Sequence, residues 1–347
     1  MRRFTIVLGI AAAAAITLSA CHNSSTGGVP PQPIPPAHFG AEYALTNPAG
    51  GPQFIIAGPD GNLWFSERGA NAIAKITLSG AIVEFSVPTA NSAPAGLAAG
   101  ADGAVWFCEF NTNKIGRVTL NGTFSETVVP TANSGPTAIT SGPDGNLWFT
   151  EQFPGKIGKI TTAGVITNEY VPATAANGAA VIVSGPDGNL WFTEFAAAKI
   201  AKITTGGTIT EFSVGLTPAS HPGFITAGAD GALWFTEQSG NKVGRIPTSA
   251  TAVAPGFTEY GVPTAASQPD GIVVGIDANM WFVENLGNKI ARMPLNATPT
   301  TGLPVAPEIT EFALPTAAAL PFGASTGPDG KIWFVENGVG KIANFVP

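Results

Sequence analysis

Cysteine, histidine and basic residues are scarce in this chain. Its 347 residues include 2 cysteines, 3 histidines and 16 basic residues against 23 acidic ones, which gives a net charge of −7. The shortage of basic residues excludes the positively charged stripe that nucleic-acid binding needs, so no nucleic-acid partner is expected. A disulfide framework is excluded as well, because Cys108 is the only cysteine outside the N-terminal segment. We predict that Cys108 is a small packed side chain, since it takes the place of a threonine in sister repeats.

Charged residues of either sign are also few. They make up 11% of the chain, whereas 44% of residues are hydrophobic and glycine and proline number 43 and 30. Disordered chains show the opposite balance, with low hydrophobicity and high charge. This composition is typical of a β protein with many turns and a large apolar interior.

Residues 1–20 are predicted to be an export signal, with arginines at positions 2 and 3 and a mostly apolar stretch at residues 6–18 that is too short for a membrane span. The stretch ends in Leu-Ser-Ala-Cys, which resembles the lipobox of bacterial lipoproteins, in which the leader is cut before a cysteine that is lipidated. We therefore expect Cys21 to anchor the protein in the bacterial cell envelope, at the outer membrane or the periplasmic side. The alternative is an ordinary secretory signal that releases the protein.

Residues 21–40 are predicted to be a tether between this anchor and the rest of the chain. A stretch rich in Asn, Ser, Thr and Gly is followed by prolines at positions 30, 31, 33, 35 and 36. Such a segment cannot build a core and behaves as a spacer, flexible at first and polyproline-like afterwards.

A ten-residue stretch recurs through the remainder, and residues 142–151, Gly-Pro-Asp-Gly-Asn-Leu-Trp-Phe-Thr-Glu, are one copy of it. A repeat of about forty residues with one tryptophan and β-type flanks is typical of propellers. Each repeat holds four short runs suited to strands, separated by Gly-containing turns. We therefore predict an all-β fold, a seven-bladed β-propeller of four-stranded blades, over residues 41–347. The copies contain all seven tryptophans, spaced by 42, 42, 43, 43, 47 and 52 residues: Trp64, Trp106, Trp148, Trp191, Trp234, Trp281 and Trp333.

The two ends of the repeat region predict how the ring closes. The last repeat has a third run at residues 341–345 and no fourth one, whereas residues 41–45 have the pattern of a fourth run and precede the first repeat. We predict that this N-terminal strand completes the seventh blade and removes an open sheet edge. The links between third and fourth runs are longer at residues 247–256 and 294–307, and we interpret them as tolerated insertions on the face opposite the candidate site.

Each repeat ends its second run with a glutamate, and blade topology predicts that these residues gather around the ring axis on one face. Seven carboxylates around a central funnel would attract a metal ion or a cationic ligand. The alternative is structural, with each glutamate bonded to backbone amides or to the basic residues of third strands. The seven residues are Glu67, Glu109, Glu151, Glu194, Glu237, Glu284 and Glu336.

One histidine of the repeat region, His221, is predicted to lie on this same face. It is either a solvated loop residue or a ligand-contacting group beside Glu237 and the sixth-blade pair Asp270 and Glu284. Two carboxylates and an imidazole suit a divalent cation, so Glu237, Asp270 and Glu284 are candidate metal ligands. Asp270, Glu284 and His221 are the candidate catalytic residues.

The repeated Gly-Pro-Asp-Gly-Asn-Leu-Trp-Phe-Thr-Glu, followed by runs of the Asn-Lys-Ile-Gly-Arg and Ile-Thr-Glu-Phe types, resembles the virginiamycin B lyase (streptogramin lyase) family of seven-bladed propellers. The resemblance spans residues 41–347 and implies a magnesium-dependent carbon–oxygen lyase that linearises streptogramin B depsipeptides. It also implies catalytic histidines in Pro-His-Gly-Ile motifs at first-strand starts, joined by a glutamate from the Trp-Phe-Thr-Glu run. The glutamate is present here, but the position after the proline carries no histidine in any repeat: Gln53, Ala95, Thr137, Ala180, Gly223, Asp270 and Phe322.

Without these histidines the lyase reaction loses its base, which typically contributes about 10²–10⁴-fold to the rate. Asp270 could replace it only if burial raised its basicity. We therefore expect a membrane-tethered, monomeric propeller that binds a small molecule, peptide or glycan on the face of the glutamates. The alternatives are a magnesium-dependent lyase that uses Asp270, Glu284 and His221, and a metal-dependent lactone or ester hydrolase.

Overall fold

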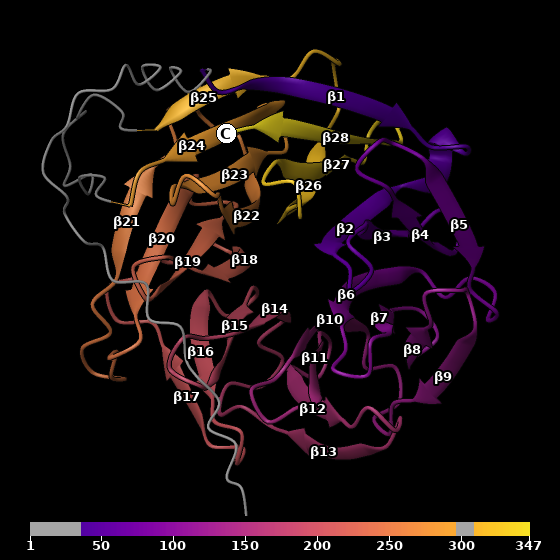
Figure 1. Ribbon diagram of the computed structural model, residues 1–347. Helices are drawn as coiled ribbons and strands as arrows, with labels where there is room; N and C mark the ends of the chain where they lie inside the picture. The colour runs from indigo at the N-terminus through magenta and orange to yellow at the C-terminus, as the bar shows by residue number, and fades with distance from the viewer. Residues whose placement is uncertain (1–35, 296–308) are drawn as a thin grey trace, which may run out of the picture. The chain divides into compact units, whose positions relative to one another are not determined.

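A computed structural model describes residues 36–295 and 309–347 of the chain. Within these residues the strands form seven four-stranded antiparallel sheets, arranged as blades around a central axis (Figure 1). This confirms the all-β seven-bladed propeller. A single-turn 3-10 helix, η1 (Pro48–Gly50), precedes the first blade. Among the described residues, no helix has the length and apolar character needed to cross a membrane.

Each of the first six blades is built from four strands that are consecutive in sequence. Blade 1 contains β2 (Pro52–Ala57), β3 (Leu63–Glu67), β4 (Ala72–Ile76) and β5 (Ile82–Ser86), and blade 2 contains β6 (Pro94–Ala99), β7 (Val105–Glu109), β8 (Lys114–Val118) and β9 (Phe124–Val128). Blade 3 contains β10 (Pro136–Ser141), β11 (Leu147–Glu151), β12 (Lys156–Ile160) and β13 (Ile166–Tyr170).

The later blades repeat this order. Blade 4 contains β14 (Ala179–Ser184), β15 (Leu190–Glu194), β16 (Lys199–Ile203) and β17 (Ile209–Phe212), and blade 5 contains β18 (Pro222–Ala227), β19 (Ala232–Glu237), β20 (Lys242–Pro247) and β21 (Thr258–Gly261). Blade 6 contains β22 (Pro269–Val274), β23 (Met280–Glu284), β24 (Lys289–Met293) and β25 (Thr310–Ala313). Of the two longer links, the one at residues 294–307 lies almost entirely outside the described residues.

Blade 7 joins the two ends of the chain. Its sheet order is β1 (His38–Ala44), β28 (Lys341–Val346), β27 (Ile332–Glu336) and β26 (Pro321–Thr326), with β1 antiparallel to β28. The predicted closure by an N-terminal strand is therefore confirmed, and Figure 1 shows β1 along the outer edge of β28. The strand begins at His38, three residues before the predicted boundary at 41, so His38 belongs to the blade rather than to the tether.

The recurring stretch forms a socket for the tryptophan of each blade. The indole N–H of Trp148 donates a hydrogen bond to Asp144 at 3.0 Å, four residues earlier. Gly142 is required because a Cβ there would lie 2.5 Å from Cδ1 of the same indole, and Gly145 takes a φ of 76° that favours glycine in the turn. All seven tryptophans donate to the equivalent aspartate at 2.9–3.1 Å. The motif therefore makes the turn and buries the tryptophan together.

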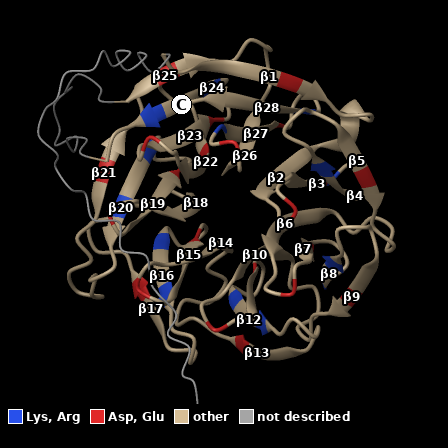
Figure 2. Cartoon of the chain, in the orientation of Figure 1, with Lys and Arg blue, Asp and Glu red and all other residues tan. Residues whose placement is uncertain are grey.

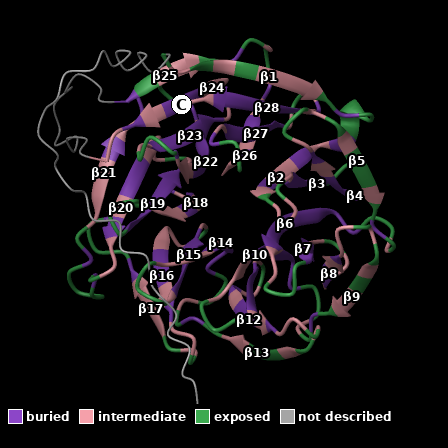
Figure 3. Ribbon diagram, in the orientation of Figure 1, coloured by how far each residue is buried: buried purple, intermediate pink, exposed green. Residues whose placement is uncertain are grey.

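The interior lies between neighbouring blades, so the inner strands are covered on both sides. Figure 3 shows this as buried segments along the inner strands and exposed ones at the rim and in the loops. Every residue of β11 is buried, for example, whereas the outer strand β13 is mostly half-buried or exposed. Cys108 is a buried free thiol packed in the cluster around Trp106, as predicted for a small packed side chain.

Basic residues of the third strands join the outer half of the blades. In blade 4, Lys199 contacts Glu211 of β17 at 2.7 Å and Thr174 of the preceding interblade link at 2.6 Å. Lys–Glu–Thr contacts of this type also occur in blades 2, 5, 6 and 7. Figure 2 accordingly shows the charged residues distributed among the blades around the ring. These groups attach the links before blades 2 to 7 to the blades that follow them, whereas blade 1 has Ala72 in place of the lysine.

Candidate functional site

The candidate site lies on the face where first strands begin and second strands end. In blades 1, 2, 3, 5, 6 and 7 a proline opens the first strand directly opposite the glutamate that closes the second, as in the pair Pro222 and Glu237. Blade 4 has Ala179 at this place, opposite Glu194. The register shifts just after this residue in each blade, so the residues that follow it are turned relative to the second strand.

The seven glutamates do not line an open funnel, which corrects the predicted arrangement. Each is fully buried, and Glu237 packs between the β19–β20 turn and the loop before its blade. A Cβ on Gly240 of that turn would lie 2.9 Å from Glu237 Oε2 and 3.1 Å from Cβ of Ser220 in the loop. The alternation of side chains along a strand does not determine which way the glutamate at the strand end points. In the structure, this side chain points into the interior between blades. The seven glutamates therefore belong to the scaffold rather than to the surface of the site.

Burial raises the pKa of these carboxyls to about 7, and to about 8 for Glu194 and Glu237. The fourth-strand glutamate of the same blade repels the charged form and raises the pKa further, as Glu259 does for Glu237. In blade 5 the third-strand Lys242 forms its ion pair with Glu259 of the fourth strand and acts on Glu237 only by lowering its pKa. These carboxyls therefore remain partly protonated near neutral pH, which weakens the attraction of the ring for a cation.

Asp270 is the one acidic residue at the second position of a first strand, and it is fully buried. Its Oδ1 accepts a hydrogen bond from Gln238 Nε2 of the neighbouring blade. Its Oδ2 has no hydrogen-bond partner among the described residues. Burial raises the pKa of Asp270 to about 7, although the hydrogen bond from Gln238 acts in the opposite direction. The carboxyl is thus poised to exchange a proton near neutral pH.

His221 lies in the loop before β18 and takes a φ of 53°. Its ring stacks on Phe195 with centroids 4.8 Å apart, and its Nδ1 lies 2.7 Å from Ser239 Oγ. Neither contact involves an acidic residue. Within residues 36–295 and 309–347, no three His, Cys, Asp or Glu side chains are grouped so as to hold a metal ion. The predicted metal ligands Glu237, Asp270 and Glu284 are therefore not brought together, with or without His221.

Among the described residues, this face therefore offers no cluster of three such side chains that would hold a magnesium ion by itself. Glu237 and Glu284 are buried under separate loops, and Asp270 is engaged by an amide. The interpretation as a metal-dependent lactone or ester hydrolase relied on axial carboxylates that coordinate a metal, so it loses its basis in the described part of the chain. On this face, Asp270 is the remaining candidate for proton transfer.

A pocket of about 170 Å³ lies close to the axis on this face. Three half-buried phenylalanines contribute to it: Phe54 and Phe224 have ring centroids 5.4 Å apart, and Phe322 lies 5.9 and 5.2 Å from them in edge-on geometry. Gln238, which holds Asp270, also lines the pocket. The remaining lining includes Thr137, Gln152 and Phe195. An apolar surface with a few amide and hydroxyl groups suits a neutral ligand that carries aromatic or aliphatic groups.

Most residues of this pocket were not among the site residues predicted from the sequence. Its two glutamines, Gln152 and Gln238, occupy the position directly after the repeated glutamate. That position differs from blade to blade: Arg68, Phe110, Gln152, Phe195, Gln238, Asn285 and Asn337. Several of these side chains reach the next blade, since Asn285 donates to the Pro321 carbonyl at 3.0 Å and Asn337 donates to the Pro52 carbonyl at 2.9 Å. The sequence did contain one sign of the pocket: the residue after the repeated glutamate varies between blades, whereas the glutamate itself does not.

Comparison with known proteins identifies a family model and several solved structures that are similar to this chain. A model of the virginiamycin B lyase family matches residues 34–181 and 168–347. No curated protein sequence matches the chain. A streptogramin B lyase structure is 37% identical, with a TM-score of 0.81, over 89% of this chain and 98% of that one.

Two structures of virginiamycin B lyase from Staphylococcus aureus are 38% identical, over 88% of this chain and 98% of theirs, with TM-scores of 0.80 and 0.79. The second is of a catalytically inactive histidine-to-alanine variant with quinupristin. A WD40 propeller domain of Doa1, at 11% identity and a TM-score of 0.69, shares the fold alone.

Proposed function

The chain belongs to the virginiamycin B lyase family, and we propose that it binds a neutral small molecule or peptide with aromatic or aliphatic groups on the axial face. The aromatic pocket carries this proposal. Phe54, Phe224 and Phe322 offer ring faces and edges for stacking, and Gln152 and Gln238 offer amides for hydrogen bonds to peptide or ester groups. A glycan would also stack on such rings, but it needs more polar partners than this pocket provides.

The seven glutamates take no direct part in this binding. They are buried beneath the loops, and their raised pKa keeps a substantial part of them uncharged near neutral pH. Recognition therefore rests on shape, apolar contact and a few amides rather than on charge. A neutral ligand is favoured because the pocket lining contains no charged side chain.

A second candidate function is carbon–oxygen lyase activity with Asp270 as the base, and it rests on the environment of that residue. Pro269-Asp270-Gly271-Ile272 has an aspartate where the family resemblance expects a histidine. Burial raises the Asp270 pKa to about 7, which lies in the range that suits a general base at neutral pH. In the related virginiamycin B lyase, a variant with one histidine replaced by alanine is catalytically inactive.

In this second candidate, Asp270 Oδ2 takes the proton from the carbon next to the substrate carbonyl. The electron pair of that C–H bond forms a carbon–carbon double bond, and the C–O bond of the ester breaks to release a carboxylate. Gln238 holds Oδ1 and so directs Oδ2. No step is assigned to a metal ion. The product is an isomer of the substrate, whereas hydrolysis of the same ester would add one water.

Quinupristin, the compound present in the related structure, is a suitable probe for both functions. We expect calorimetry to detect binding to the protein and to show a loss of at least tenfold in affinity for Phe224→Ala. The exposed rim variant Val128→Ala is the matched control and should bind as the parent does. Absence of binding, or equal binding by Phe224→Ala, would contradict the proposed pocket.

Chromatography of the same mixtures, with and without magnesium, separates binding from turnover. Recovery of unchanged quinupristin supports a binding protein. Conversion to an isomer that drops about 10²–10⁴-fold in Asp270→Asn supports the lyase. Conversion that is equal in Asp270→Asn would contradict Asp270 as the base, and a product heavier by one water would contradict elimination.

We further propose that Cys21 is acylated and attaches the protein to the bacterial cell envelope. The proposal rests on the lipobox-like end of the leader, which lies outside the described residues. Metabolic labelling with a fatty-acid analogue should mark the parent protein and not Cys21→Ser. Equal labelling of both, or labelling of neither, would contradict acylation at this residue.

A further inference from the structure

The first strands of all seven blades enclose a channel along the axis, next to the aromatic pocket. Figure 1 shows these strands as the innermost of each blade: β2, β6, β10, β14, β18, β22 and β26. The channel has a volume of about 210 Å³, and every first strand contributes to its lining. It shares Phe54, Val181 and Phe224 with the aromatic pocket, so the two spaces meet at these side chains.

The channel is lined by aliphatic side chains that protein atoms do not fully cover. Successive residues of a strand point to opposite sides. In blades 1 to 6 the fourth residue of the first strand is only 2–5% exposed and belongs to the core between blades: Ile55, Leu97, Ile139, Ile182, Ile225 and Ile272. In blades 1, 3, 4, 5 and 6 the fifth residue lines the channel and is half-buried: Ile56, Thr140, Val183, Thr226 and Val273. Open space therefore lies against these side chains.

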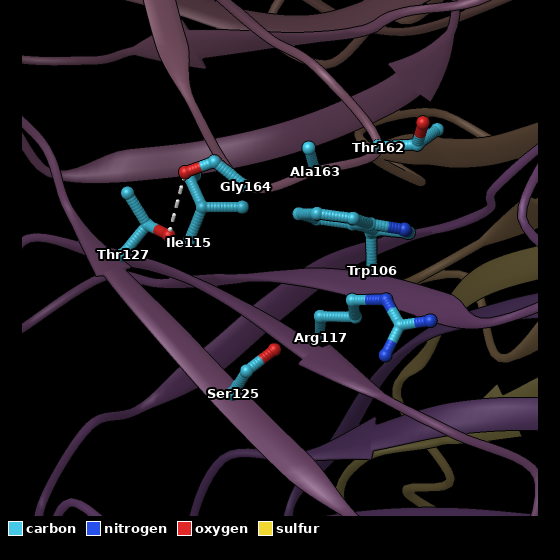
Figure 4. Close-up of a pocket in the computed structure, with 8 residues that line it drawn as sticks. All are labelled: Trp106, Ile115, Arg117, Ser125, Thr127, Thr162, Ala163 and Gly164. Carbon is cyan, nitrogen blue, oxygen red and sulfur yellow. Dashed lines mark hydrogen bonds between the residues drawn. The ribbon is translucent and has the colours of Figure 1, made fainter.

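A hollow between the outer strands of blades 2 and 3 lacks this property. Figure 4 shows the residues around it, among them Trp106 and Ile115. Both of these side chains are only 1% exposed, and Thr127 donates a hydrogen bond across one side to the Gly164 carbonyl at 3.1 Å. The tryptophan and the isoleucine thus offer a ligand almost no apolar surface, whereas the residues of the axial channel do.

Close contacts between neighbouring first strands hold the channel walls in place. A Cβ on Gly96 would lie 2.6 Å from Cα of Ala138 in the next blade, so the glycine lets the two strands approach closely. At the end of the channel away from the aromatic pocket, the Ser184 hydroxyl donates to the Ser141 carbonyl of the preceding blade at 2.5 Å. The channel is therefore preformed, and a ligand that enters it does not have to order its walls.

Two phenylalanines stand where the aromatic pocket meets the channel. Phe54 of blade 1 and Phe224 of blade 5 have ring centroids 5.4 Å apart, and both rings are half-buried. A chain that extends from the pocket into the channel passes beside these rings. The third residue of the first strand is smaller in the other five blades: Gly96, Ala138, Val181, Gly271 and Gly323.

We propose that the axial channel binds an unbranched acyl or alkyl chain of a ligand whose aromatic or amide head group occupies the aromatic pocket. This inference rests on the proposed axial binding function and narrows its ligand class to acylated amides, esters or peptides. The lining residues carry no charge, and Thr140 and Thr226 are the polar side chains among them. Burial of a hydrocarbon chain against the remaining aliphatic groups is favourable. The volume exceeds that of a cavity of about 150 Å³ that holds benzene.

The test uses N-acyl phenylalaninamides, which are neutral and offer the pocket one aromatic ring and two amides. Calorimetry compares the acetyl, butanoyl, hexanoyl and octanoyl members on the full-length protein. Affinity should rise about fourfold for each methylene that enters the channel, up to the length that fills it. Equal affinity of the acetyl and octanoyl members would overturn the channel and leave the aromatic pocket in place. Absence of binding by the octanoyl member would also overturn it, and the quinupristin titration with Phe224→Ala tests the pocket separately.

Variants that fill the channel make the result specific. Thr226→Trp places a large ring in the channel and should bring the ratio of octanoyl to acetyl affinity close to one. Val183→Phe fills the same space from blade 4 and should act alike, which keeps the test valid if one variant does not fold. Val128→Trp adds the same indole at the exposed outer rim and should retain the parent ratio. A ratio that is unchanged in folded Thr226→Trp or Val183→Phe would place the chain elsewhere and overturn the proposal.

Discussion

The interior of the blades and the axial face use the same repeat in opposite ways. In the interior, all seven tryptophans donate to an aspartate four residues earlier, and all seven glutamates are buried under loops. On the axial face, the residue after that glutamate changes from blade to blade, and the second position of the first strand changes too. An interior position meets the same neighbours in every blade, so one residue type suits all copies. If the axial face binds one asymmetric ligand, as proposed above, each copy of an axial position meets a different requirement.

Removal of β1 should have the largest effect on this scaffold. Deletion of residues through Leu45 takes away the strand that completes blade 7 and exposes the edge of β28. We expect a marked drop in the midpoint of thermal unfolding and a tendency to aggregate. A truncated protein that unfolds at the parent temperature would show that closure contributes nothing to stability.

Substitution of an interior and an axial aromatic residue of the same blade should separate stability from binding. Trp234→Ala removes a fully buried ring together with its bond to Asp230, so it should lower the free energy of unfolding by about 3–5 kcal/mol. Phe224→Ala removes a half-buried ring and should cost about 1–2 kcal/mol while it weakens ligand binding. If Trp234→Ala and Phe224→Ala lowered the free energy of unfolding equally in denaturant titrations, the division between an interior residue for stability and an axial residue for binding would be contradicted.

The buried glutamates should make the protein less stable as the pH rises. Their folded pKa of about 7 to 8 lies above the unfolded value near 4.5, so the folded state holds protons that the unfolded chain releases across this interval. Stability from these groups is complete below about pH 4 and is lost between about pH 4 and pH 8. Carboxylates such as Asp144, with a pKa of about 2, act in the opposite sense only at lower pH.

Chemical denaturation at pH 5 and pH 8 checks this sign. Glu237→Gln should reduce the loss of stability across the interval, because one fully shifted group contributes about 1.4 kcal/mol for each pH unit. Glu84 is an exposed fourth-strand residue that acts on Glu67 only by repulsion, the smaller cause of its raised pKa, so Glu84→Gln should leave the interval nearly as steep as in the parent. A protein that gains stability from pH 5 to pH 8 would contradict protonated glutamates in the interior.

Asp270→Asn should have the smallest effect on stability and should change ligand binding instead. The amide retains the shape of the carboxyl, but it does not ionise, so any step in ligand affinity near pH 7 should disappear. The free energy of unfolding at pH 5 should stay within about 1 kcal/mol of the parent, because the carboxyl is largely protonated there. Persistence of a step near pH 7 in the variant would assign the titration to another group.

The blades were predictable because their packing repeats in the sequence. A glycine that clears an indole and an aspartate that accepts its N–H are needed each time, so the motif returns with every blade. The direction of Glu237 was not predictable, because strand alternation does not say whether a residue at a strand end faces the axis or a loop. The partners of Asp270 were not predictable either, since Gln238 reaches it across blades.

Pairing of β1 with β28 also determines when the protein can finish folding. The ribosome makes residues 38–44 first and residues 341–346 some three hundred residues later. Six blades can assemble during translation from neighbouring segments, but blade 7 has to wait until β28 has emerged, and its contact spans nearly the whole chain. Until then β1 has no native partner, so the nascent chain carries one unpaired strand through almost all of its synthesis.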